Sequence, residues 1–121
     1  MRIGAASIAA HTGDTPQPLR FDGQPGVVIA PGQDRLSDPL SLPTADRQAL
    51  QVSVYLPDPT PLQTFHWDGR QTSWIAPGDQ HRLPALHGAS STTARLLLSG
   101  IEVEAAASAR SVVVIGDSIT D

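Results

Sequence analysis

The sequence predicts a mainly β fold, an antiparallel β-sandwich of the jelly-roll kind, and three observations support that class. Eleven prolines and ten glycines fall mostly within the first ninety residues, so no long helix fits there. Short apolar segments between them alternate with a period of two. Asp-Gly and Pro-Gly dipeptides, which favour tight turns, separate these segments. Strands this short and this regularly spaced are typical of antiparallel sandwiches.

The expected strands follow one another from the N-terminus. Residues 3–10 are mostly small, with four alanines, a glycine and a serine beside two isoleucines, which favours a strand over the greasier core of a signal peptide. The clearest strand covers residues 48–56. One of its faces carries Leu50, Val52, Val54 and Leu56, which are expected to point into one core, and the other carries Gln51, Ser53 and Tyr55. Shorter strands are expected at residues 19–21, 27–30, 36–42, 64–67 and 72–75, and a last long one at 96–103.

Composition excludes several classes of function. The chain has 121 residues and 40% apolar residues, enough for a single core. Its net charge is −4 without a basic patch, so neither nucleic acid nor an anionic membrane surface is an expected partner. No segment reaches the roughly 20 apolar residues of a membrane span. The absence of cysteine rules out disulfides and thiolate metal sites.

The pattern changes after residue 104. Residues 105–110 are small and loosely patterned, as expected of a linker. Residues 112–115 are apolar without alternation, which is what a central strand of a parallel, helix-covered sheet requires. We therefore expect an accessory sandwich at 1–104, a linker at 105–110, and the first strand of a truncated α/β domain at 111–121. Outside that domain the strand should be exposed, disordered or paired with another chain rather than buried in the sandwich, and it should promote association.

The end of this strand carries a motif, Gly116-Asp117-Ser118-Ile119-Thr120-Asp121. A serine at this point would meet the N–H groups of a following helix, beyond the carboxyl end of the strand, where open α/β sheets bind ligands. The motif resembles the first block of the GDSL/SGNH esterase and lipase superfamily. Upstream segments, among them "LQVSVYLPDPT" and "TFHWDGRQTSWIAPGD", look like the β-sandwich that precedes the catalytic domain in one bacterial branch of that family.

The resemblance implies a function and a site. Ser118 would be the nucleophile and its N–H an oxyanion donor, while Asp117 would help to shape the loop. The substrate would be an ester, acylated carbohydrates included, with no metal or cofactor, and the enzyme would be secreted or periplasmic. In the family, a glycine, an asparagine and a late Asp-x-x-His complete the site, so we expect this chain to be a piece cut at both ends and inactive by itself.

Two other interpretations stand beside this one. Gly-Asp-Ser is also a common turn, because its side chains bond to neighbouring backbone. The sandwich could instead be a non-catalytic module that binds carbohydrate or protein, which an exposed row of aromatic residues would favour. The sequence predicts Trp67 and Trp74 in the core, His66 packed on an edge strand, and the remaining histidines, His11, His81 and His87, scattered on the surface.

Overall fold

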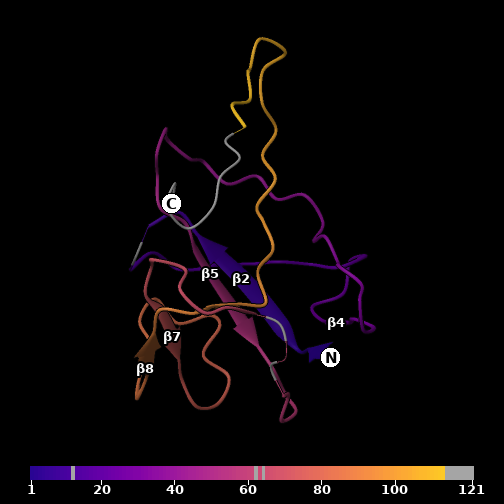
Figure 1. Cartoon of the computed structure of the whole chain (residues 1–121), viewed down its shortest axis with the longest axis vertical. Coiled ribbons are helices and arrows are strands. Elements are labelled where there is room, and N and C mark those ends of the chain that lie inside the picture. Colours follow the sequence, from indigo (N-terminus) through magenta and orange to yellow (C-terminus); the bar gives the residue numbers. More distant parts are fainter. Residues whose placement is uncertain (12, 62, 64, 114–121) are drawn as a thin grey trace.

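The computed structural model describes residues 1–11, 13–61, 63 and 65–113, and in these residues the chain is mainly β. None of them is assigned to a helix. The strands are short and joined by long irregular segments (Figure 1). They are β1 (Arg2–Ile3), β2 (Ala5–Ala9), β3 (Gln17–Pro18), β4 (Val27–Val28), β5 (Gln51–Tyr55), β6 (Phe65–His66), β7 (Ser73–Ile75), β8 (Ser90–Thr92) and β9 (Arg95–Leu96).

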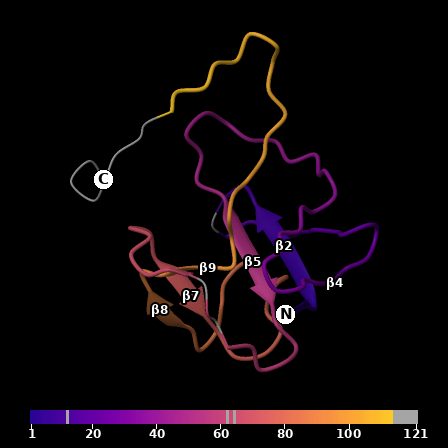
Figure 2. The ribbon, with the colours of Figure 1, turned by 45° about the vertical axis from the view of Figure 1, so that its right-hand side comes forward.

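The strands form one three-stranded sheet and three strand pairs, all antiparallel. The larger sheet has the order β3-β2-β5, and β2 and β5 lie side by side in both ribbon views (Figures 1 and 2). Their register pairs Ala5 with Tyr55 and Ala9 with Gln51. The pairs are β1-β4, β6-β9 and β7-β8. In the described residues no strand follows β9, and the segment after it runs away from the strands and then turns back, drawn orange to yellow in Figure 1.

The core lies along the first two strands. The buried apolar residues described are Ile3, Ala6, Ile8 and Ala9 in these strands and Pro16 just before β3, and Ser7 has no exposed surface. Consecutive buried residues mean that both faces of β2 are covered, which suits the central strand of a sheet. Small side chains allow other segments to approach it closely on both sides.

The strand expected at residues 48–56 forms as β5, but the expectation that one of its faces enters a core is wrong. Val54 is 40% exposed, and its alternating partners Leu50, Val52 and Leu56 are only half-buried. The opposite face is half-buried too. The reason is position: β5 is at the edge of its sheet, so β2 covers it from one side only.

Several other predicted strands are shorter than expected, and some do not form. Residues 3–10 divide at Gly4 into β1 and β2, and the segments at 27–30, 64–67 and 72–75 shrink to β4, β6 and β7. Residues 19–21 contribute only a single bridge, and residues 36–42 contain no strand. The prediction of a long strand at 96–103 is also wrong, because β9 ends at Leu96. Leu97 has φ of 61° and Leu98 N–H donates to the Leu96 carbonyl (2.7 Å), so a three-residue turn closes there.

Asp38 lies in the segment predicted as a strand at 36–42, but its side chain binds the backbone of a turn at residues 22–23. Asp22 and Gly23 have φ of 53° and 76°, the conformation of a tight turn between Phe21 and Gln24. The Asp38 carboxylate accepts hydrogen bonds from both turn N–H groups, at 2.9 Å and 2.8 Å. A charged acceptor on two backbone donors holds this turn more firmly than neutral contacts do. The segment predicted as a strand therefore clamps a turn instead.

Candidate functional site

The residues predicted for catalysis, Ser118 and Asp117, lie outside the described residues. Of the apolar run at 112–115 that precedes them, the structure describes the first two residues. Val112 and Val113 are 89% and 79% exposed, so these two residues of the expected strand at 112–115 lie outside the core, as predicted. The candidate sites that the structure does describe are two histidine–carboxylate pairs and an exposed group of aromatic side chains.

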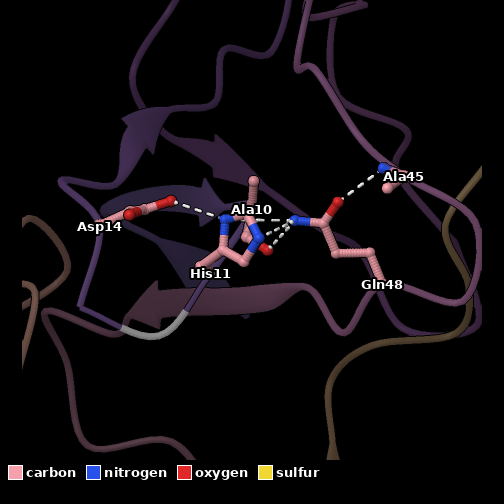
Figure 3. Close-up of polar contacts among 5 residues, drawn as sticks. All are labelled: Ala10, His11, Asp14, Ala45 and Gln48. Carbon is pink, nitrogen blue, oxygen red and sulfur yellow. Dashed lines mark hydrogen bonds and ion pairs between the residues drawn. The ribbon is translucent and has the colours of Figure 1, made fainter.

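The first pair, His11 and Asp14, lies just after the end of β2, where the side-chain amide of Gln48 contacts His11 (Figure 3). The Gln48 Oε1 atom accepts the Ala45 N–H at 2.6 Å, and Nε2 donates to the Ala10 carbonyl at 2.5 Å. Nε2 is also 3.0 Å from Nε2 of His11. One amide therefore joins the loop after residue 42 to the end of the central strand.

The same contacts define the tautomer of His11. Its Nδ1 lies 3.2 Å from Oδ2 of Asp14, an acceptor when ionised, so Nδ1 carries the proton. The Gln48 Nε2 atom lies 3.0 Å from Nε2 and 3.3 Å from Nδ1 of this ring, so the amide faces both ring nitrogens. A pocket of about 290 Å³ adjoins the pair, lined by Ala9, Ala10, His11, Asp14, Thr15, Gln17, Leu42 and Pro43.

We expect Gln48→Ala to lower the free energy of unfolding by about 1–2 kcal/mol, since it removes hydrogen bonds to the partly buried Ala10 carbonyl and to Ala45. Urea denaturation measures the change. Gln71→Ala, at an exposed position, is the matched control and should be neutral within about 0.5 kcal/mol. Equal effects of the two substitutions would show that Gln48 does not join these segments.

The second pair is in the loop between β7 and β8. Nδ1 of His81 lies 2.5 Å from Oδ1 of Asp79, and the hydrogen bond from His81 holds the pKa of Asp79 below its ordinary value. The His81 side chain is only 13% exposed. Its backbone carbonyl accepts the hydroxyl of the buried Ser7, which ties the loop to β2. The prediction of a scattered surface histidine is therefore wrong for His81.

The Gln80 side chain braces this loop from within. Its Nε2 donates to the carbonyls of Pro77 and His87, at 2.8 Å and 3.1 Å, and its Oε1 accepts the His87 N–H at 2.8 Å. The Leu83 N–H donates to the Gln80 carbonyl at 3.0 Å, so His81 and Arg82 are the central residues of a β-turn. The only feature in the sequence that indicates this arrangement is an Asp two residues before a His within a Pro- and Gly-bounded segment.

The Asp79 pair should make stability depend on acid pH. A carboxyl group whose pKa is lower in the folded state stabilises the protein fully above its unfolded pKa, and that contribution is lost as pH falls through the folded value. The loss therefore begins near the ordinary value of 3.8 and proceeds downward. We expect Asp79→Asn to be less stable than the parent at pH 6, and the difference to shrink toward pH 2. Urea midpoints between these pH values measure it, and a constant difference would contradict the assignment.

The tryptophans are the clearest correction to the sequence-based expectations. Trp67 is 76% exposed and Trp74 is 59% exposed, so neither lies in the core, and His66 is exposed rather than packed. For Trp67 the reason is the register of the pairs β6-β9 and β7-β8. Between the pairs His66–Arg95 and Ser73–Thr92, one segment has six residues and the opposite segment has two, so residues 67–72 form a bulge that contains Trp67. Trp74 lies within β7, which among the described strands pairs only with β8.

Other classes of site find no support in the described part of the chain. No group of three or more His, Cys, Asp or Glu residues there could hold a metal ion. Nor does any helix there have the length and apolar character needed to cross a membrane.

Comparison with known proteins yields no relative. No family model, curated protein or solved structure matches the chain. Functional inference therefore depends on the residues themselves.

Proposed function

We propose that this chain supplies the accessory β domain and the nucleophile segment of a GDSL/SGNH-type ester hydrolase. The observation that carries the proposal is the apolar run 112–115 leading directly into Gly116-Asp117-Ser118. In this proposal the strand pairs at 1–104 belong to a jelly-roll-like sandwich, residues 105–110 link it to the catalytic domain, and 111–121 begin that domain.

The exposure of the C-terminal segment supports this division. All residues from 101 to 113 are exposed. Within this segment the Ala109 N–H donates to the Ala106 carbonyl at 2.8 Å, which closes a local turn. Val112 and Val113, the described part of the apolar run, are uncovered, as residues in the first strand of a separate, helix-covered sheet would be without its neighbours. Val112 and Val113 would be buried once those neighbours were present.

The mechanism would be acyl transfer through a covalent intermediate. The Ser118 hydroxyl attacks the ester carbonyl, a general base takes its proton, and the alcohol leaves after protonation. The Ser118 N–H stabilises the oxyanion together with other donors. The 121 residues contain no asparagine and no Asp-x-x-His, so the remaining oxyanion donor and the base come from later blocks of the domain.

Comparing two chains tests this proposal. Residues 1–121 alone should hydrolyse no p-nitrophenyl acetate through Ser118, because a serine without a base is a weak nucleophile. A chain extended through the later blocks should hydrolyse it. An extension without an asparagine-bearing block and a late Asp-x-x-His, or an inactive extended protein, would contradict the hydrolase assignment.

The exposed tryptophans favour a second function for the β domain, the binding of carbohydrate. Trp67 and Trp74 present large, flat side chains to solvent, and such rings bind ligands through their faces while the indole N–H donates a hydrogen bond. A binding domain of this kind is compatible with the hydrolase, since it would hold an acylated polysaccharide near the catalytic domain.

We expect Trp67→Ala or Trp74→Ala to weaken polysaccharide binding by about tenfold or more, as loss of a central aromatic contact does. Affinity electrophoresis in gels containing acetylated xylan, cellulose or chitin measures the retardation. Leu36→Ala, which removes another exposed apolar side chain, is the control and should not change it. Retardation that survives both tryptophan substitutions would exclude these residues as the binding surface.

A further inference from the structure

The geometry points to a binding site for a small oxyanion, a carboxylate or a phosphate, between the β2-β3 ladder and the 80–83 turn. A cavity of about 250 Å³ lies there, several times the roughly 30 Å³ that one water occupies in the liquid. Its wall is formed by Ala5, Ala6, Pro18, Leu19, Arg20, Pro25, His81 and Arg82. The site is independent of the proposed hydrolase function.

The charge of this wall is one-sided. It includes two arginines and a histidine but no carboxylate, in a chain whose net charge is −4. Within the described residues, the guanidinium groups of Arg20 and Arg82 form no ion pair or hydrogen bond. Two acids are close to Arg20 along the backbone, Asp22 two residues later and Asp38, whose N–H donates to the Arg20 carbonyl; neither lines the cavity, and the Asp38 carboxylate already accepts the two N–H groups of the 22–23 turn. Unsatisfied cations around a concave surface attract anions.

The His81 ring is fixed in the wall of this cavity. The contact from Nδ1 to Asp79 holds the ring in place and leaves Nε2 without a hydrogen bond in the described part of the chain. Because Nδ1 donates to the Asp79 carboxylate, Nε2 of the neutral ring is an acceptor, so the donors to an anion are the two guanidinium groups. The Ser7 hydroxyl and the Gln80 amide fix the backbone on which the ring stands. The site is therefore held in place before any ligand binds, which lowers the entropic cost of binding.

Two guanidinium groups select for the class of ligand. Each has a planar set of N–H donors that matches the paired oxygens of a carboxylate or phosphate, and such contacts are charge-assisted. Arg20 follows β3, whereas Arg82 is in the turn beside His81, so an anion that bridged them would join the two segments. Part of the wall is formed by the small apolar side chains of Ala5, Ala6 and Pro18, which leave space for a short substituent on the anion.

Titration of the 121-residue chain with sodium phosphate and, separately, sodium acetate tests the site, at constant ionic strength and followed by amide ¹H–¹⁵N spectra. We expect saturable shifts at Arg20, His81 and Arg82. Arg20→Gln and Arg82→Gln should each weaken binding by about tenfold or more, because each removes charge-assisted contacts. The control Arg35→Gln removes the same charge at an exposed position outside the cavity and should change affinity less than about twofold.

The two anions distinguish phosphate from carboxylate as the group that the site binds. Saturation by phosphate alone assigns the site to phosphate groups, saturation by acetate alone to carboxylates, and saturation by both to oxyanions in general. Unperturbed amide spectra outside the cavity show that each variant is folded, and either arginine variant is sufficient for the test. Absence of saturable shifts with both anions, or equal weakening by Arg35→Gln, would overturn the proposal.

Discussion

Replacing Ser118 with alanine should reduce ester hydrolysis by the extended protein by at least about a thousandfold, because removing a nucleophile abolishes the covalent route and leaves only binding and oxyanion stabilisation. The loss should be in kcat, with little change in KM, since the hydroxyl acts on the reacting carbonyl rather than on the remainder of the substrate. Initial rates with p-nitrophenyl acetate measure both constants.

The matched control for this substitution is Ser111→Ala, which removes a hydroxyl just before the apolar run and is expected to keep full activity. An Ser118→Ala enzyme with activity within about tenfold of the parent would show that Gly-Asp-Ser is an ordinary turn here, the alternative that its residue types also allow. A comparable loss in the Ser111 variant would indicate damage to the strand rather than removal of a nucleophile.

Replacing Gly26 with alanine should lower the free energy of unfolding of the 121-residue chain by about 1–3 kcal/mol, the usual cost of forcing extra volume into a packed site. A Cβ at this position would lie 2.5 Å from the Ile3 carbonyl oxygen and 2.8 Å from that of Gly4. Both obstacles are backbone atoms, so the side chains cannot relieve the contact. Ile3 belongs to the core and pairs with Val27, so the displaced backbone would disturb the β1-β4 pair.

Gly100→Ala is the control for Gly26→Ala. A Cβ at Gly100 meets no atom within 4 Å, and the position lies in the exposed segment after β9. Alanine there should be neutral or slightly stabilising, through the smaller entropy of the unfolded chain. Urea denaturation of the two variants should therefore separate them clearly, and equal stability would mean that the β1-β4 pair does not approach Gly26 closely.

The mainly β class could be predicted because its causes are local. Proline and glycine act on their own backbone, and the Asp22-Gly23 turn forms where its residue types predict it. The strand at β5 likewise follows from its own alternation. Each of these features depends on residues within a few positions of one another.

The predictions that the structure contradicts have a different physical origin, because they depend on contacts with residues far away in the sequence. Alternation in β5 indicates a strand but not whether the strand is central or at an edge, and the edge position leaves Val54 exposed. The outward position of Trp67 follows from a bulge that exists only relative to residues 93–94. The 36–42 segment failed as a strand because Asp38 serves the turn at 22–23 instead.

The candidate sites divide in the same way. Ser118 is a candidate through a short motif, the apolar run directly before it and the upstream segments that resemble the family's sandwich, all of which are visible in the sequence. The cavity at Arg20, His81 and Arg82 needs β2, β3 and a loop more than sixty residues later in the sequence to come together. No pattern in the sequence indicates that pairing, although the Asp79-Gln80-His81 segment could have indicated an oriented histidine.

Labelling with a fluorophosphonate tests the central claim, that Ser118 is an activated nucleophile, more directly than turnover does. The reagent reacts with a serine only where a base and an oxyanion site activate it. Peptide mapping by mass spectrometry of the labelled extended protein should place one adduct on Ser118, and Ser118→Ala should abolish it. An active extended protein that stays unlabelled at Ser118, or is labelled on another residue, would contradict the assignment.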